Sequence, residues 1–378
     1  MSMKIVHIYW GLSYGGIETM LVNIINEQVS AGAKVCMMLI NDLYADELIA
    51  KLSPEVEIIY IGRKPGDKSL SFINRINRQL DIARPDIIHL HHTATSNFIA
   101  RRWRKRMCCT VHDIPHGVKG ADFRCINIFQ WMLRPRLNNV RAAQLIPQIF
   151  AISASVADGL WTNYSIKSDV VYNGIQTEIF KRRAPITPED RFKIIQVSRL
   201  DHRKKGQDLL IEALAILSGQ GFDDFHVTFI GSGESLDTLS KLAESLKLSD
   251  RIVFAGAKEQ KYIAEHLSDY DLFVQPSRKE GFGLTVAEAM AADLPVLVSA
   301  GQGPEEITKG DTFGYTFTSD NAADLALKIR QIRENYAEAL EKAAQARDEV
   351  YRNYSVKNTA ATYLRHYSKI IQTLDEKH

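Results

Sequence analysis

Two carboxylates, Glu280 and Glu288, lie on either side of a glycine turn that opens a predicted helix. The alanine-rich run from Leu284 onward is typical of a helix, and Gly281 and Gly283 allow the turn backbone conformations that other residues rarely adopt. The first N–H groups of a helix have no partner within it and carry a positive dipole end, so they bind anions such as phosphate. At 1.5 Å rise per residue the carboxylates should lie roughly 8–12 Å apart, about the span of a sugar diphosphate.

The start of this helix carries a second signal. Thr285 and Glu288 have the spacing of a capping box. In this motif the Thr side chain accepts from the backbone N–H of the Glu, and the Glu side chain accepts from the backbone N–H of the Thr. We therefore expect the helix to be capped by its own side chains.

A cationic loop follows another apolar run, residues 192–197, and contains Arg199 and Lys205. A diphosphate leaving group gains negative charge as its bond to a sugar breaks, and enzymes stabilise such charge with positioned cations or a metal ion. Arg199 and Lys205 are the candidates for this chemistry, and the adjacent Arg203 and Lys204 are expected to be surface charges. The alternative is that the whole turn is a solvated basic loop.

Short apolar runs alternate with helical stretches and would position these residues. The runs occupy residues 4–10, 34–40, 56–61, 87–90, 108–112 and 148–152, and then 192–197, 227–230, 252–254, 272–274 and 295–298. Such alternation predicts an α/β fold with parallel, doubly wound sheets, whose ligands bind beyond the carboxyl ends of the strands. Because 378 residues exceed one ordinary core, we expect two Rossmann-like domains. Their predicted bounds are 1–175 and 191–354, with a linker over 176–190 and a final helix in 355–378.

With these elements in place, Glu280-Gly-Phe-Gly-x4-Glu288 resembles the E-x7-E signature of the family 4 retaining glycosyltransferases, which have the GT-B fold. The resemblance runs from about Lys4 to Leu374. It implies two Rossmann-like domains facing a cleft, with the C-terminal helix packing back on the N-terminal domain. It also implies transfer of a sugar from a UDP- or GDP-linked donor to an acceptor hydroxyl, with the anomeric configuration kept and without a metal ion or other cofactor. Bacterial capsule, cell-wall or lipopolysaccharide synthesis is the expected context.

The resemblance assigns roles to single residues. Glu280 would approach the donor sugar, and Glu288 would bind the ribose hydroxyls. Arg199 and Lys205 would contact the diphosphate, while His112, at the end of a predicted strand, would reach the donor sugar. The other implied donor-binding positions are Gly15, Gly16, Gly231, Gly233, Gly256, Gly281, Phe282, Gly283, Leu284 and Thr285.

The N-terminal domain would bind the acceptor, a saccharide or a lipid-linked saccharide, with His91 and His92 in the wall of its site. His89 and His91 point to the same face of a strand, but no carboxylate or cysteine completes a metal set at ligand spacing. Asp269-Tyr270-Asp271 spells the D-x-D of metal-dependent GT-A enzymes, yet its place beside a strand favours a structural role. We therefore expect no metal site.

Two other hypotheses stay open. A different GT-B enzyme is one of them, although an epimerase uses other carboxylates and no pyridoxal-lysine context of a phosphorylase is visible. A catalytically silent GT-B scaffold subunit is the other. Scaffolds usually lose site residues, whereas the five residues with assigned side-chain roles all stand in this chain: His112, Arg199, Lys205, Glu280 and Glu288.

Composition places the chain among soluble proteins, with 45% hydrophobic and 24% charged residues and a net charge of +2. We expect a cytoplasmic protein, because no apolar stretch of about 18 residues, signal peptide or paired cysteine spacing is present. The densest basic run is Arg101, Arg102, Trp103, Arg104, Lys105 and Arg106. It suits either a solvated helix face or peripheral contact with the anionic inner membrane surface, and no nucleic-acid partner is expected.

Overall fold

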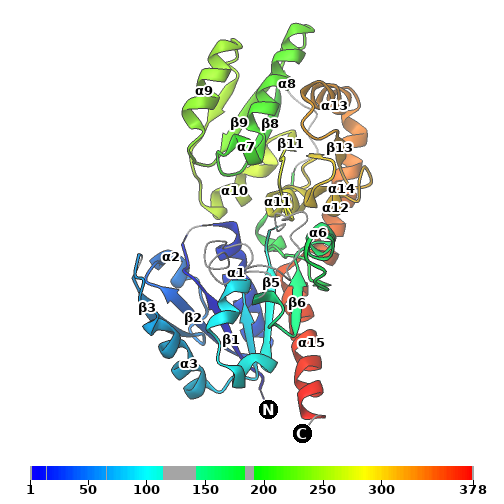
Figure 1. Cartoon of the computed structure of the whole chain (residues 1–378). Helices are drawn as coiled ribbons and strands as arrows, with labels where there is room; N and C mark the ends of the chain where they lie inside the picture. The colour runs from blue at the N-terminus through cyan, green and yellow to red at the C-terminus, as the bar shows by residue number, and fades with distance from the viewer. Residues whose placement is uncertain (1, 14, 65, 114–141, 184–190, 377–378) are drawn as a thin grey trace. The chain divides into compact units, whose positions relative to one another are not determined.

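The computed structural model describes residues 2–13, 15–64, 66–113, 142–183 and 191–376. The chain divides into two compact units, Met1–Gly174 with Val356–His378, and Ile175–Ser355 (Figure 1). The first unit thus takes its last helix, α15 (Val356–Asp375), from the far end of the sequence.

A parallel sheet forms the centre of the first unit. Its seven strands, counted over the described residues, follow the order β3-β2-β1-β4-β5-β6-β7. The strands are β1 (Lys4–Tyr9), β2 (Lys34–Asn41), β3 (Glu57–Arg63), β4 (Ile87–Leu90), β5 (Met107–Val111), β6 (Gln148–Ala151) and β7 (Asp169–Val170). The α-helices among the described residues are α1 (Gly16–Ser30), α2 (Asp46–Ile49), α3 (Ser71–Ala83), α6 (Ala154–Tyr164) and α15. Every residue of β4 is buried, as expected for a strand that helices cover on both faces.

A second parallel sheet forms the centre of the other unit, in the order β10-β9-β8-β11-β12-β13. Its strands are β8 (Phe192–Val197), β9 (Phe225–Ile230), β10 (Ile252–Phe254), β11 (Leu272–Gln275), β12 (Val296–Ser299) and β13 (Tyr315–Phe317). The described helices are α7 (His202–Lys205), α8 (Gln207–Gly219), α9 (Leu236–Ser245), α10 (Gln260–His266), α11 (Leu284–Ala291), α12 (Gly303–Thr308), α13 (Ala322–Glu334) and α14 (Tyr336–Asn353). Helices α8 and α13 pack against each other beside this sheet (Figure 1).

Both sheets reverse their strand order at one place, between β1 and β4 and between β8 and β11. Ligands of open parallel sheets bind at such a switch point, beyond the carboxyl ends of the strands. The loops after β8 and β11 carry Arg199, Lys205 and Glu280, and His112 directly follows β5. The predicted α/β class with two Rossmann-like domains is therefore confirmed.

Helix α15 contributes to the core of the first unit. It packs along α1, and its Tyr363 and Tyr367 side chains are fully buried (Figure 1, red). The Tyr363 ring lies 5.0 Å from the ring of His89 and 5.2 Å from that of Phe150, between centroids. These contacts make α15 an integral part of the unit.

The segment 176–190 extends partly beyond the described residues. Its described part joins the second unit, because Lys181 N donates to Ala264 O and Arg183 N donates to Ala292 O. These residues are therefore anchored to the fold of that unit.

Helix α11 begins differently from the expectation. Its N-cap is Gly283 at φ 96°, and no side chain caps this end. The predicted capping box of Thr285 and Glu288 is therefore wrong, because the left-handed turn favours glycine at the cap position and Glu288 is instead buried inside the unit.

The basic run forms a six-residue 3-10 helix, Arg101–Arg106, rather than the face of an α-helix. Asp81 accepts hydrogen bonds from Arg102 Nη2 at 2.5 Å and from Trp103 Nε1 at 3.0 Å. Part of the charge of the run is therefore balanced by a neighbouring carboxylate. Every helix in the described part of the chain is too short or too polar to span a bilayer.

Candidate active site

Two loops at the carboxyl ends of the second sheet bring a lysine and a glutamate into contact. Lys205 ends α7 after strand β8, and Glu280 lies in the loop after β11. Lys205 Nζ donates to Glu280 Oε2 at 2.5 Å, and the two side chains are 24% and 18% exposed. This partly shielded ion pair lies at the switch point of the sheet, where a ligand is expected.

Hydrogen bonds hold these two loops against each other. Arg278 N and Lys279 N donate to the same carbonyl, Lys204 O, at 2.8 and 3.2 Å. The Arg278 guanidinium also donates to His202 O and to Asp208 Oδ1, each at 2.8 Å. The Arg278 side chain therefore joins the two loops and is committed to these bonds.

Gly206 permits the close approach of the loops. Its φ is +67°, and a Cβ there would lie 1.9 Å from the carbonyl oxygen of Pro276. Any other residue would force the loop after β8 away from the loop after β11. The Lys205–Glu280 pair thus depends on a glycine at the next position.

The predicted glycines Gly231, Gly233 and Gly256 gather beside the cationic loop. A Cβ on Gly231 would lie 2.0 Å from Ser198 O, and one on Gly233 would lie 2.3 Å from Leu200 O. Gly231 N donates to Gly256 O at 2.9 Å. The three predicted glycines therefore belong to the same part of the second unit as Arg199.

Arg199 combines a fixed backbone with an extended side chain. Gln207 Nε2 donates to Arg199 O at 2.9 Å, and Gln196 Nε2 donates to Lys205 O at 2.8 Å. The Arg199 side chain is 70% exposed, and its Nη2 lies 3.6 Å from Asp201 Oδ2. The loop is thus rigid at its base while the guanidinium extends into solvent.

The backbone N–H and C=O groups of Glu280 are both hydrogen-bonded. Glu280 N donates to Gln302 Oε1 and Gly303 N donates to Glu280 O, each at 3.0 Å. Gln275 Nε2 approaches Glu280 Oε2 at 3.5 Å, so this oxygen faces both an amide and the Lys205 ammonium. The carboxylate therefore has a defined position.

The glycine turn leads directly into α11. Phe282 is buried and its ring packs against Tyr354, with 5.9 Å between centroids. Its side chain therefore anchors the turn, and a ligand would meet backbone atoms here. The N–H groups of Leu284 and Thr285 occupy the first turn of the helix, where helices bind anions.

Glu288 is buried on α11, and Gln260 Nε2 donates to its Oε1 at 3.4 Å. Burial raises the pKa of the Glu288 carboxyl to about 7, while the Gln260 bond opposes this shift. The group therefore changes charge close to neutral pH.

The first unit contains a cavity of about 580 Å³ that reaches the ends of β1, β4 and β5. This volume is within the range of small-molecule sites. The predicted residues His91, His92 and His112 line it. Other lining side chains are Tyr9, Trp10, Glu18, Asn41 and Tyr164.

Glu18 is a residue of this cavity that the sequence did not single out. Tyr9 Oη donates to Glu18 Oε1 at 3.1 Å, so the carboxylate is held at the cavity wall. Gly15 is the N-cap of α1, and a Cβ there would meet Glu18 Oε2 at 2.2 Å. The predicted Gly15-Gly16 turn therefore leaves room for this carboxylate.

His112 lies next to another histidine. His112 Nε2 is 3.3 Å from His91 Nδ1, and His91 Nε2 is 3.0 Å from His7 Nδ1. Both ring nitrogens of His91 are thus occupied by neighbouring histidines. His91 therefore lines the cavity with neither ring nitrogen free for a further hydrogen bond.

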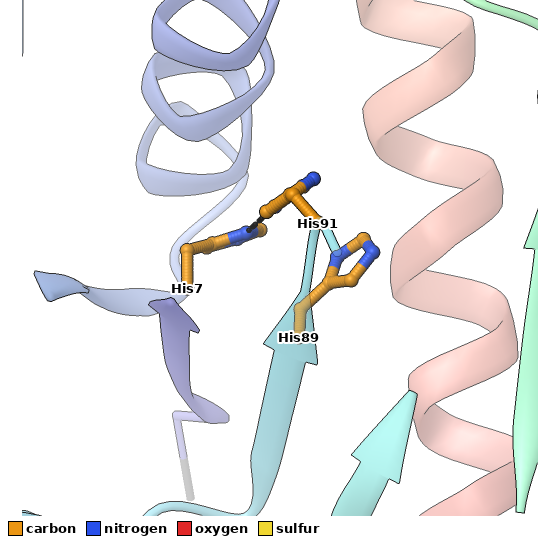
Figure 2. A group of neighbouring side chains, drawn as sticks. All are labelled: His7, His89 and His91. Atoms are coloured by element: carbon orange, nitrogen blue, oxygen red, sulfur yellow. Dashed lines mark hydrogen bonds between the residues drawn. The ribbon is translucent and has the colours of Figure 1, made fainter. Parts of the chain in front are cut away.

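His7, His89 and His91 form a buried cluster with nitrogen atoms close enough for a shared metal ion (Figure 2). All six ring nitrogens already take part in hydrogen bonds within the first unit. A metal ion would have to break several of these bonds. His7 was missed because its closeness depends on the pairing of β1 with β4, which aligns His7 with His89.

The carboxylates of Asp269 and Asp271 have structural partners. Asp271 Oδ1 accepts from Arg183 Nη2 at 2.6 Å, and its Oδ2 accepts from Lys193 N at 2.7 Å. Asp269 lies 2.8 Å from His266 Nδ1. The D-x-D segment therefore stabilises the second unit.

Two Rossmann-like domains, with a cationic loop and a glycine turn at the carboxyl ends of the second sheet, define the GT-B class of transferases. Sequence comparison agrees. Residues 14–179 match the family described as Glycosyltransferase Family 4, and residues 177–350 match Glycosyl transferases group 1. The chain belongs to the family 4 glycosyltransferases, as its E-x7-E spacing predicts.

Curated relatives and solved structures extend this finding. N-acetyl-alpha-D-glucosaminyl L-malate synthase of Bacillus anthracis is 27% identical over 312 residues, which cover 76% of this chain and 75% of the relative. D-inositol 3-phosphate glycosyltransferase of Mycolicibacterium smegmatis is 25% identical over 78% of this chain and 69% of its own length. The Anabaena Alr3699/HepE structure with UDP and glucose has a TM-score of 0.77 at 19% identity, covering 97% and 99% of the two chains. This last likeness shows the shared fold.

Proposed function

We propose that the protein is a retaining glycosyltransferase that moves a sugar from a UDP- or GDP-linked donor to an acceptor hydroxyl. The observation that carries this proposal is the 2.5 Å contact between Lys205 Nζ and Glu280 Oε2 beside the start of α11. It places a cation, a carboxylate and a helix N-terminus at one switch point, and these are the groups that a sugar diphosphate requires.

The leaving group is stabilised by fixed charge. Arg199 and Lys205 neutralise the diphosphate as its bond to the sugar breaks, and the first N–H groups of α11 bind its oxygens. With two cations and a helix end available, the reaction requires no divalent ion. Activity that persists in excess EDTA would support this part of the proposal.

The two glutamates have separate roles. Glu280 positions the donor sugar, and Glu288 accepts hydrogen bonds from the ribose hydroxyls. The acceptor oxygen forms the new bond at the anomeric carbon, the bond to the diphosphate breaks, and the acceptor proton passes to the departing diphosphate. Attack on the face that the diphosphate leaves keeps the anomeric configuration.

The cavity of the first unit binds the acceptor, and His112 contacts the donor sugar. Tyr9, Trp10 and Glu18 offer aromatic faces and a carboxylate, which suit a hydroxyl-bearing molecule. Relatives are named for L-malate, for D-inositol 3-phosphate, and for amylovoran or lipopolysaccharide core biosynthesis. We therefore place this protein in bacterial glycan assembly, with a saccharide or lipid-linked saccharide as acceptor.

A lipid-linked acceptor would bring the cytoplasmic enzyme to the inner face of the membrane. Arg101 and Lys105 are exposed in the basic run, and they supply charge for an anionic surface. Sedimentation with phosphatidylglycerol vesicles at low salt tests this contact. Failure to sediment would remove it without affecting the proposed chemistry.

The test of function is a donor panel. UDP, GDP and ADP sugars are screened by thermal shift, and the best donor is then incubated with saccharide, malate and inositol phosphate acceptors. Release of the nucleoside diphosphate with a new glycosidic bond of retained configuration supports the proposal. A changed sugar without transfer would indicate an epimerase, and donor binding without any turnover would indicate a scaffold subunit.

A further inference from the structure

A chain of hydrogen bonds runs from helix α1 to His112 through the first unit. Gln28 Oε1 lies 2.8 Å from His7 Nε2, and His7 Nδ1 lies 3.0 Å from His91 Nε2. His91 Nδ1 then lies 3.3 Å from His112 Nε2. Figure 2 shows the hydrogen bond between the two central members, His7 within β1 and His91 directly after β4.

All three histidines of this chain are neutral near pH 7. Burial lowers the pKa of His7 and of His112 to about 4, and it lowers the pKa of His91 well below the ordinary value. A neutral imidazole donates from one nitrogen and accepts at the other. The direction of the first hydrogen bond therefore determines the direction of every later one.

The orientation of the Gln28 amide supplies that first direction. Tyr367 Oη lies 2.5 Å from His89 Nδ1 and directs its own proton to that nitrogen, so its oxygen accepts from Gln28 Nε2 at 3.4 Å, which turns Oε1 toward His7. An amide oxygen can only accept, so His7 carries its proton on Nε2 and accepts at Nδ1. His91 must then donate from Nε2 and accept at Nδ1, and His112 must donate from Nε2.

We propose that Gln28, held by Tyr367, is a positioning residue that fixes His112 as the Nε2–H tautomer through His7 and His91. His112 Nδ1 is then an unprotonated acceptor, and it is buried without a partner among the described residues. Any group that pairs with this atom must donate a hydrogen bond, as a sugar hydroxyl does. The catalytic consequence rests on the proposed function of His112, whereas the tautomer does not.

Two tyrosines of α15 provide a matched pair of variants. Tyr367 contacts both Gln28 Nε2 and His89 Nδ1, while the Tyr363 hydroxyl bonds to Thr110 Oγ1. Both side chains are buried on the same helix. Tyr367→Phe removes the acceptor that orients the Gln28 amide, and Tyr363→Phe leaves that acceptor in place.

The experiment is nitrogen NMR of protein labelled with 15N-histidine, with the His112 signals assigned from a His112→Gln variant. The wild type and Tyr363→Phe should show only the Nε2–H tautomer at His112. Tyr367→Phe and Gln28→Met should show a mixture of tautomers. An Nδ1–H tautomer in the wild type, or an unchanged single tautomer in Tyr367→Phe and in Gln28→Met, would overturn the proposal.

Turnover provides the second readout. In Tyr367→Phe and Gln28→Met, kcat should fall in proportion to the lost fraction of the Nε2–H tautomer, and Tyr363→Phe should retain wild-type kcat. If the His112 tautomer changes in these variants while kcat does not, Gln28 has no positioning role in catalysis. If the wild type transfers no sugar, the proposed function fails while the NMR result still decides the tautomer.

Discussion

Lys205 and Glu280 are 75 residues apart in sequence, yet their side chains meet with 2.5 Å between Nζ and Oε2. The contact depends on two loops that share the Lys204 carbonyl and on a glycine at position 206. It joins the cationic loop after β8 to the glycine turn after β11. The two halves of the proposed donor site are therefore one structural feature.

Replacing Glu280 by glutamine should abolish most of the transfer activity and leave the fold intact. The amide keeps the size of the side chain but cannot form the ion pair with Lys205 or position the sugar through a charge. We expect kcat to fall by about 10²–10³-fold, the usual cost of removing one positioned polar group from an active site. Transfer kinetics and thermal unfolding together measure this effect.

The exposed Glu265 offers a control on the same unit, since its nearest cation is Lys261 at 4.0 Å on the helix surface. Glu265→Gln should keep wild-type turnover. Equal activity of Glu280→Gln and wild type would remove Glu280 from the mechanism.

The Glu288 carboxyl should make nucleotide affinity depend on pH. Its pKa is raised to about 7 by burial, so it becomes ionised as the pH rises through neutrality. An ionised carboxylate is the stronger acceptor for ribose hydroxyls. Calorimetric titration should show tighter nucleotide binding at pH 8 than at pH 6, and Glu288→Gln should lose this difference.

The same group should lower folding stability as the pH rises. The folded pKa exceeds the ordinary carboxyl value of 4.5, so between about pH 4.5 and 7 the folded state holds a proton that the unfolded state has lost. Stability from this group is present below pH 4.5 and falls by up to about 1.4 kcal/mol per pH unit toward pH 7. Denaturant unfolding of Glu288→Gln should lack this contribution. An identical pH slope in both proteins would contradict the assignment.

Gly206→Ala should destabilise the second unit far more than an ordinary glycine substitution. The added Cβ would overlap Pro276 O at 1.9 Å, and φ is +67°. Gly310 has a similar φ of +63° but open space around its Cβ position, so Gly310→Ala measures backbone strain alone. We expect about 1–2 kcal/mol for Gly310→Ala and at least about 2 kcal/mol more for Gly206→Ala. Equal losses in denaturant unfolding would show that the loops do not require the close approach.

Much of the architecture could be predicted because apolar runs of strand length are a local property of the sequence. The runs at 87–90, 192–197 and 252–254 match β4, β8 and β10 in both bounds. The spacing of Glu280 and Glu288 likewise lies within one segment and identifies the family. Such signals do not depend on which distant strands become neighbours.

Features that depend on pairing between distant elements were harder to predict. The closeness of His7 to His89 follows from the β1–β4 register, and Gln28 joins them from a helix. The predicted side-chain cap of α11 was wrong for a different reason. The helix begins at a left-handed turn whose cap position is Gly283, which has no side chain. The sequence could not predict that His7, His89 and Gln28 lie together, because their contacts arise only in the folded unit.

Calorimetric binding of UDP and GDP to Lys205→Met and Lys204→Met tests most directly whether Lys205 binds the donor diphosphate. Lys204 is exposed next to the site, so the two variants remove the same charge from adjacent positions. If Lys205 binds the diphosphate, Lys205→Met should weaken the better nucleotide by about tenfold to a hundredfold, and Lys204→Met should stay close to wild type. Equal affinities of wild type and Lys205→Met would show that Lys205 does not bind the diphosphate.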